Sequence, residues 1–325
     1  MVTVCAYCPQ YVLADATIGD MSLLFITLPI FLLIALGYVL RSLHGITRDG
    51  IHALNGFVYF ISLPAVILIS FWGIDWFDEQ TRWVLLTNTV AVVGFALVLW
   101  LLLRILPFAK RIKAGIFISA LVGNTVYMGF PIGERALGES VYDIFLAAAT
   151  PHLAIGIAVS IIAIEWYVLK SHNPLRYIKD FALNPLILAL AGGITLSVLN
   201  VSGELVELVK QPITMLAATA SPIALVTLGA FLHGAFKFKL AGYALIATTL
   251  KLLILPATIY LVGQLFALDA VLVSASVLAA AMPTAVTSFV IAERYNAAPE
   301  LVATTLFMST VCSLGTITAL LFFLL

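Results

Sequence analysis

The chain is 325 residues long, 63% of its residues are hydrophobic, only 10% are charged, and its mean hydropathy is +1.14. No soluble domain has this composition, so a membrane protein is expected. The basic and acidic residues balance to a formal net charge of zero, which argues against a nucleic-acid-binding role.

Runs of about 20 mostly apolar residues are long enough to cross a bilayer as helices. Ten such runs predict an all-α membrane protein with ten transmembrane helices, at residues 21–40, 51–72, 83–106, 114–135, 141–168, 183–199, 211–232, 241–266, 271–294 and 299–324. They leave no room for a soluble catalytic domain, so no enzyme is expected. The predicted organisation is an N-terminal tail (1–20), a first five-helix repeat (21–170), a cytoplasmic linker (171–182) and a second repeat (183–325).

The three cysteines are too few for a disulfide framework. Cys5 and Cys8 form a Cys-x-x-Cys pair in the tail, but no second Cys or His pair lies nearby to complete a metal site. Cys312 lies in the tenth apolar run and is expected to pack as a small hydrophobic side chain. No metal and no cofactor are therefore expected.

The lysines and arginines gather in alternate connections. Twelve follow the odd-numbered runs, three follow the even-numbered ones, and Lys251 lies inside a run. Since cytoplasmic connections of membrane proteins hold the excess of positive charge, the odd connections are predicted to be cytoplasmic. We therefore expect a multi-pass protein of the inner (cytoplasmic) membrane whose N-terminus and C-terminus both face outside.

The fourth and ninth runs are interrupted at matching places. The interruptions are Gly123–Pro131 and Met282–Phe289, and the segment Phe130–Arg135 resembles Phe289–Arg294 at an offset of 159 residues. An odd number of helices per half forces the second copy to enter the membrane upside down. Matched broken helices in inverted repeats are how secondary transporters build a substrate site near the middle of the membrane.

The residues of the two interruptions suit a binding site. Pro131 and Pro283 are expected to break their helices and free backbone groups, while Gly123 and Gly129 allow close backbone approach. Six side chains are expected to bind a ligand or to satisfy the freed backbone groups: Asn124, Thr125, Tyr127, Thr284, Thr287 and Ser288. If the broken helices cross, their half-helix N-termini favour an anion. The alternative for either proline alone is a simple kink.

Two ionisable residues lie deep inside apolar runs, where a charge costs at least about 2.5 kcal/mol. Lys251 lies in the eighth run beside Pro256 and is a candidate to bind a substrate carboxylate or to neutralise a buried acid. His152 follows Pro151 in the fifth run and is a candidate to carry a proton or to bind the substrate. A hydrogen bond from His152 to a neighbouring helix, with no further role, is the alternative.

The segments GNTVYMGFP (123–131) and MPTAVTSFVIAERYNAAPE (282–300) resemble the auxin efflux carrier family, which includes bacterial malonate and malate permeases and the plant PIN-type exporters. The resemblance extends from about residue 21 to residue 325. It implies a fold like that of bile-acid symporters and sodium/proton antiporters, in which helices one, two, six and seven form a scaffold and the other helices move. It also implies elevator-type alternating access, homodimers through the scaffold, Asn124 as the crossover asparagine, and Pro131 and Pro283 as helix-breaking prolines.

These observations favour a secondary transporter of a small organic anion, auxin-like or a dicarboxylate such as malate or malonate. The main alternative is a sodium- or proton-coupled symporter or antiporter of the same fold with a bile-acid-like or other substrate. Such a sodium site usually gathers acidic or amide oxygens, of which the mid-membrane residues hold few. An intramembrane hydrolase would need a metal motif or an activated nucleophile, which the sequence does not contain. A receptor without transport would not need an inverted repeat.

Overall fold

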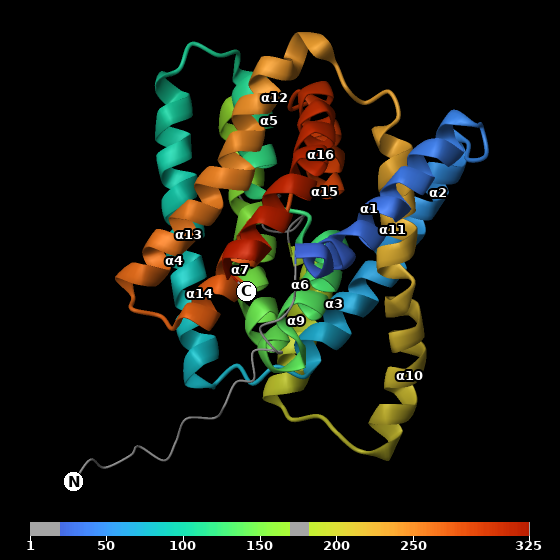
Figure 1. Ribbon diagram of the computed structural model, residues 1–325, viewed down its shortest axis with the longest axis vertical. Helices are drawn as coiled ribbons and strands as arrows, with labels where there is room; N and C mark the ends of the chain where they lie inside the picture. The colour runs from blue at the N-terminus through green and yellow to red at the C-terminus, as the bar shows by residue number, and fades with distance from the viewer. Residues whose placement is uncertain (1–19, 170–181, 325) are drawn as a thin grey trace.

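The computed structural model describes residues 20–169 and 182–324 (Figure 1). Within these ranges the chain consists of helices, the turns and loops that join them, and one isolated β-bridge. The Cys5–Cys8 pair lies outside the described residues, as do the tail up to residue 19 and the linker up to residue 181.

The helices of the first half lie over the first five predicted runs. In chain order they are α1 (Asp20–Ser42), α2 (Arg48–Phe57), η1 (Val58–Ser62), α3 (Leu63–Trp72), α4 (Glu79–Ile105), α5 (Lys110–Leu121), η2 (Thr125–Gly129), α6 (Phe130–Leu137), α7 (Glu139–Ile164) and η3 (Glu165–Leu169). The fourth run is divided between α5 and the η2–α6 segment.

The helices of the second half lie over the remaining runs. They are α9 (Pro185–Val198), α10 (Glu204–Ala218), α11 (Ala220–Leu232), η4 (Phe238–Leu240), α12 (Ala241–Thr249), η5 (Leu250–Ile254), α13 (Leu255–Leu265), α14 (Ala270–Ala280), α15 (Val286–Arg294) and α16 (Pro299–Leu324). The ninth run is divided between α14 and α15.

Six helical stretches among the described residues are long and apolar enough to cross a membrane: Asp49–Trp72, Glu79–Ile105, Val141–Val168, Glu204–Leu232, Phe238–Leu265 and Pro299–Phe323. Shorter apolar helices cover Thr27–Ser42, Pro185–Val198 and Ala270–Ala280. A predominantly helical chain of this kind is what the composition predicts for a membrane protein, because a helix satisfies its own backbone hydrogen bonds in lipid.

Prolines explain three local changes in helical winding. The π-helical turns η1, η2 and η5 each run directly into an α-helix. The second residue of that α-helix is in each case a proline: Pro64 in α3, Pro131 in α6 and Pro256 in α13. A proline offers no N–H to the carbonyl one turn earlier, so the preceding turn can widen to the i→i−5 hydrogen bonds of a π-helix. In η5 this widening occurs at Lys251.

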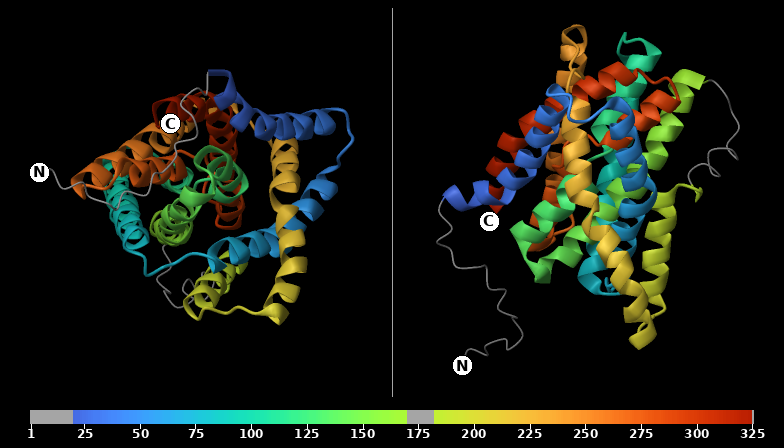
Figure 2. Two further views of the ribbon diagram at one scale, coloured as in Figure 1. Left: turned by 60° about the horizontal axis from the view of Figure 1, so that its bottom comes forward. Right: turned by 90° about the vertical axis from the view of Figure 1, so that its right-hand side faces the viewer.

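The helices pack in two groups. In the first group, α1 lies along α11, and α3 packs against α9 and α10. The left view of Figure 2 shows α1 at the upper right, α10 and α11 down the right-hand side and α3 below the centre, with most of the second group to their left. In the second group, α4, α7 and α14 contact one another, as do α5, α12 and α16.

Glycines permit the closest contact in the first group. A Cβ atom at Gly37 would collide with the Val226 carbonyl, and one at Gly229 would collide with the Ile34 carbonyl, so α1 and α11 touch backbone to backbone. Gly193 of α9 has the same role against α3, where a Cβ atom would lie 2.8 Å from the Leu68 carbonyl oxygen. The first group is therefore closely fitted along two separate helix pairs.

Candidate functional site at the crossing of two broken helices

The two gaps in the broken helices meet and hydrogen-bond to each other. Gly123, in the gap after α5, forms an antiparallel β-bridge with Thr284, in the gap after α14. The Asn124 N–H donates to the Pro283 carbonyl at 2.6 Å, and the Ala285 N–H donates to the Val122 carbonyl at 3.0 Å. Backbone groups that the breaks free from their own helices thus find partners in the opposite gap, as a medium without water requires.

Two of the predicted side chains also satisfy freed backbone groups. The Thr284 hydroxyl donates to the Ser119 carbonyl at 2.8 Å, and its N–H donates to the Ser309 hydroxyl of α16 at 3.1 Å. The Ser288 hydroxyl donates to the Val122 carbonyl at 3.3 Å. Of the two roles expected for Thr284 and Ser288, the described contacts support the structural one.

The crossing presents two helix beginnings. η2 starts directly after Asn124 and α15 starts directly after Ala285, and neither of these cap residues makes a side-chain cap bond. The Asn124 carbonyl accepts hydrogen bonds from the N–H groups of Met128 and Gly129. Helix N-termini carry partial positive charge, so both beginnings favour a nearby anion.

Asn124 is the predicted residue with an unused donor. Its side chain is 2% exposed, and its Nδ2 atom has no hydrogen-bond partner among the described residues. A buried amide nitrogen without a partner costs about 1–3 kcal/mol, so such a group calls for a ligand or an ordered water. An anion at the start of η2 would accept this hydrogen bond.

The remaining predicted side chains of η2 and α15 make no hydrogen bond to any residue that the structure describes. Thr125 and Tyr127 are buried in η2, and Thr287 is half-buried in α15. A Cβ atom at Gly129 would lie 3.0 Å from the Met282 side chain, so this glycine lets η2 pass close to the opposite gap. Pro283 lies in the gap between α14 and α15.

Pro131 differs from this pattern. It lies in the first turn of α6, after η2, and the gap in the fourth run comes earlier, at residues 122–124. The extended backbone of Val122 and the β-bridge at Gly123 therefore mark the break, while Pro131 accompanies the π-helical turn. Because α6 continues η2, the N–H that Pro131 lacks leaves the carbonyl one turn earlier without its usual partner, which fits the π-helical winding of η2.

Lys251 lies at the crossing. Its side chain is fully buried, and its ammonium donates to the Ala280 carbonyl, at the end of α14, at 2.8 Å. A Cβ atom at Gly123 would lie 2.9 Å from the Lys251 Nζ atom, so the ammonium also lies against the backbone of the first gap. No carboxylate of the described residues lies within ion-pair distance of Lys251.

His152 belongs to a separate buried network. Asn88 of α4 donates through Nδ2 to the Val84 carbonyl and to the Ser276 hydroxyl of α14, both at 2.9 Å. Its Oδ1 atom is therefore the acceptor for His152 Nε2 at 3.2 Å. Hence His152 carries its hydrogen on Nε2, and its buried Nδ1 atom has no partner among the described residues.

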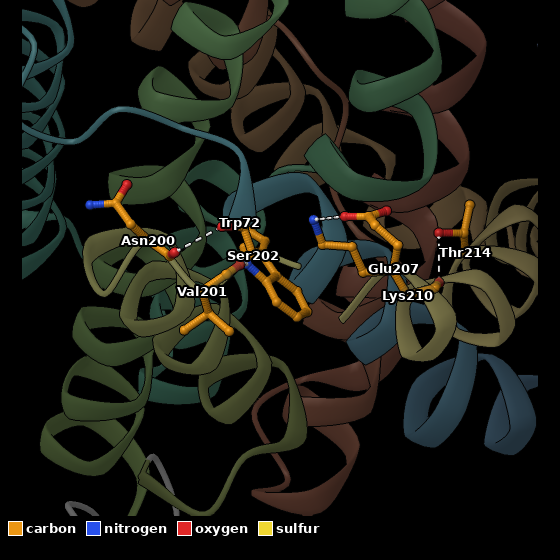
Figure 3. Close-up of polar contacts among 7 residues, drawn as sticks. All are labelled: Trp72, Asn200, Val201, Ser202, Glu207, Lys210 and Thr214. Carbon is orange, nitrogen blue, oxygen red and sulfur yellow. Dashed lines mark hydrogen bonds and ion pairs between the residues drawn. The ribbon is translucent and has the colours of Figure 1, made fainter. Parts of the chain in front are cut away.

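Sequence reasoning missed an open cavity of about 400 Å³ at the ends of α3 and α9 (Figure 3). The Trp72 indole donates to the Val201 carbonyl at 3.1 Å, and Lys210 lies 4.7 Å from the Trp72 ring centre. Lys210 also pairs with Glu207 at 3.0 Å. Lys210 of the cavity lining is thus paired, and the Asp75 carboxylate of the lining accepts hydrogen bonds from the backbone N–H groups of Phe77 and Asp78.

The fold and the crossing define a multi-pass membrane protein built around two discontinuous helices, the arrangement of secondary transporters. Residues 24–321 match the family described as "Membrane transport protein", so the chain belongs to this family, which is the auxin efflux carrier family of the sequence resemblance. It is accordingly a membrane transporter, and the family supports a non-enzymatic role.

Three relatives are similar over most of their length. A protein of Rhizobium meliloti (strain 1021) named "Putative malonate transporter" is 29% identical over 308 residues, which cover 91% of this chain and 94% of the relative. "Uncharacterized transporter YfdV" of Escherichia coli (strain K12) is 26% identical over 292 residues, covering 86% and 88%. An "Uncharacterized transporter" of Methanothermobacter thermautotrophicus is 25% identical over 294 residues, covering 88% and 93%.

Proposed function

We propose that this protein is a secondary transporter of a small organic anion and that the anion binds at the crossing of the two broken helices. The observation that carries the proposal is the Asn124 amide, a buried donor with no partner among the described residues, at the beginning of η2. The α15 beginning and the Lys251 ammonium add positive charge to the same region. Thr125, Tyr127 and Thr287 complete the proposed surroundings of the substrate.

The proposed substrate class is a carboxylate. A carboxylate accepts hydrogen bonds through two oxygens, which suits an amide donor beside helix beginnings. The similarity to a protein named for malonate makes a dicarboxylate such as malonate or malate the first choice, ahead of an auxin-like monocarboxylate. His152 is proposed to support this region through Asn88 and Ser276.

We propose further that the chain forms ten transmembrane helices as two inverted five-helix repeats. Two aromatic contacts support the repeat. The ring centres of Phe71 in α3 and Phe130 in α6 are 6.2 Å apart. Those of Phe231 in α11 and Phe289 in α15 are 4.5 Å apart. Phe130 and Phe289 are 159 residues apart, and Phe71 and Phe231 are 160 apart, so each half makes the same contact at the offset of the sequence repeat.

The two groups of helices suggest the mechanism. We propose that the group of α1, α3, α9, α10 and α11 is a scaffold that forms a homodimer, and that the other group carries the crossing across the membrane in an elevator-type movement. Contacts of η2 with α11 support this mechanism, because α11 belongs to the proposed scaffold. The proposed location is the cytoplasmic membrane, with both termini outside.

Uptake into proteoliposomes tests the proposal. Labelled malonate, malate and indole-3-acetate are offered to wild type, to Asn124→Ala, and to Asn200→Gly as a control in an exposed loop. A hydrogen bond to a charged group contributes about 1.5–3 kcal/mol, so we expect a roughly 10- to 150-fold loss of affinity in Asn124→Ala and none in the control. Absence of saturable flux for every acid, or equal flux in Asn124→Ala, would contradict the proposal.

A further inference from the structure

Two cavities adjoin at one end of the first group of helices, away from the crossing. The cavity of about 400 Å³ lies at the ends of α3 and α9, and a second cavity of about 530 Å³ lies between α3 and α10. Both are lined by Trp72, Gly73 and Lys210. The second cavity continues along the two helices to Ile69 and Met215. Each volume is in the range of small-molecule sites.

The two cavities lie at the depth of a membrane surface. The apolar stretch Asp49–Trp72 ends there and the apolar stretch Glu204–Leu232 begins there, and both are long enough to cross a membrane. On α10, Leu205 and Leu208 are 80% and 66% exposed, so in a membrane they contact lipid. Tryptophan is enriched at this depth, as Trp72 illustrates. A ligand of these cavities therefore shares the level of lipid headgroups.

The lining offers hydrogen-bond donors that suit a phosphate. The Lys210 ammonium has three N–H groups and gives one to Glu207 at 3.0 Å. That ion pair is exposed, so it contributes little and leaves Lys210 able to bind a second anion. Trp76 lines the first cavity, and its buried indole N–H has no partner among the described residues. A phosphate oxygen accepts from both kinds of donor.

The same lining offers acceptors and aromatic rings that suit an ammonium. Asp75 accepts two backbone hydrogen bonds, both on Oδ1, so its Oδ2 atom accepts none from the residues that the structure describes. Ring faces attract cations, and three aromatic side chains line the first cavity: Trp72, Trp76 and Phe77. The carboxylates of Asp75 and Glu207 outnumber the Lys210 ammonium, which disfavours a ligand with net negative charge.

We infer that the adjoining cavities bind a zwitterionic phospholipid, phosphatidylethanolamine, with its phosphate at Lys210 and Trp76 and its ammonium at Asp75. An acyl chain follows the second cavity along α3 and α10. Trp72 already joins α3 to the loop before α10, through Val201, and to α10 itself, through Lys210 (Figure 3). The bound lipid fastens the same elements together. This site is separate from the crossing, so the inference goes beyond the proposed function and does not depend on it.

Native mass spectrometry of the delipidated full-length protein tests this. The protein is titrated with palmitoyl-oleoyl phosphatidylethanolamine and with palmitoyl-oleoyl phosphatidylglycerol, which has the same acyl chains and a net negative charge. We expect wild type to bind the ethanolamine lipid at least about fivefold more tightly. Lys210→Met should weaken its binding by about fivefold or more, and the control Lys239→Met, at an exposed position, by less than about twofold.

The variant Asp75→Asn tests the ammonium end. It keeps an Oδ1 acceptor for the backbone and removes the charge, so the preference for the ethanolamine lipid should fall to within about twofold. Equal affinity of wild type for the two lipids, or unchanged affinity in Lys210→Met, would overturn the inference. Loss of a dimer in Lys210→Met at unchanged lipid affinity would instead assign this surface to a second copy of the chain. If the variants do not fold, the wild-type comparison decides alone.

Discussion

The gap after α5 and the gap after α14 pair with each other through their backbones and differ in side-chain chemistry. Each gap accepts one backbone hydrogen bond from the other, through the Pro283 carbonyl and through the Val122 carbonyl. Hydroxyl and amide groups complete the first helix end, whereas an ammonium completes the second. The pairing of the gaps therefore satisfies backbone groups in both halves, and the side chains then make the site asymmetric.

A second pair of regions differs in the same way. Asn88, His152 and Ser276 lie on the mutually contacting helices α4, α7 and α14 and are linked by hydrogen bonds. In the opposite half in each case, Thr248 corresponds to Asn88, Thr310 to His152 and Ser119 to Ser276, at offsets of 157 to 160 residues. These three residues lie on the mutually contacting helices α12, α16 and α5. These three hydroxyls are buried and have no partner among the described residues, so one trio is linked by hydrogen bonds and the other is not.

The largest expected effect comes from closing the space between the two gaps. In Gly123→Ala the new methyl group would lie 2.9 Å from Lys251 Nζ and 3.0 Å from its Cε, so the end of the lysine side chain must shift and its hydrogen bond to the Ala280 carbonyl is disturbed. Because the displaced charge has no other described partner, we expect at least a tenfold loss of anion uptake. Gly94→Ala in α4, where a Cβ atom meets nothing within 4 Å, is the control and should keep wild-type uptake.

The next effect concerns stability at the neutral helix end. Thr284→Val removes the hydroxyl that donates to the Ser119 carbonyl and leaves that carbonyl buried, at a cost of about 1–3 kcal/mol. Thr258→Val is the matched control, because the Thr258 hydroxyl makes an exposed hydrogen bond to the Ile254 carbonyl of the same helical segment. This change should cost less than about 0.5 kcal/mol. Thermal unfolding in detergent measures both. Equal shifts in the two variants would mean that the Thr284 contact does not hold the gaps together.

The smallest expected effect compares the two polar trios. Ser276→Ala removes the acceptor of the Asn88 amide and is expected to cost about 1 kcal/mol of unfolding free energy. Thr310→Val removes a hydroxyl without a described partner and is expected to be neutral or slightly stabilising. Thermal unfolding in detergent also measures this pair. A larger loss in Thr310→Val than in Ser276→Ala would reveal a partner of Thr310, such as an ordered water, and would reverse the comparison.

The sequence predicted the parts of this site that depend on local chemistry. The helical runs and the interruptions at 123–131 and 282–289 were predicted from hydropathy, proline and glycine, and the helices lie over those runs, whereas the gaps between helices cover only residues 122–124 and 281–285. The family resemblance is confirmed by the match over residues 24–321. The assignment of Asn124 and the other site residues to substrate binding stays a prediction.

Long-range partners escaped prediction because no local pattern encodes them. Ser119 and Thr284 are 165 residues apart, and Asn88 and Ser276 are 188 apart. Ser119, Ser309 and Asn88 are polar residues inside apolar runs, which is the signal that would have directed attention to them. Lys251 was recognised by its depth, but its contact with the end of α14 depends on how η5 packs at the crossing.

The most direct measurement is equilibrium binding of the acid that uptake identifies, in labelled form, to purified wild type, Asn124→Ala and Asn200→Gly. If the anion binds at the crossing, wild type and Asn200→Gly will bind it with the same dissociation constant, and Asn124→Ala will bind it at least tenfold more weakly. Equal binding by all three proteins would contradict a site at the beginning of η2.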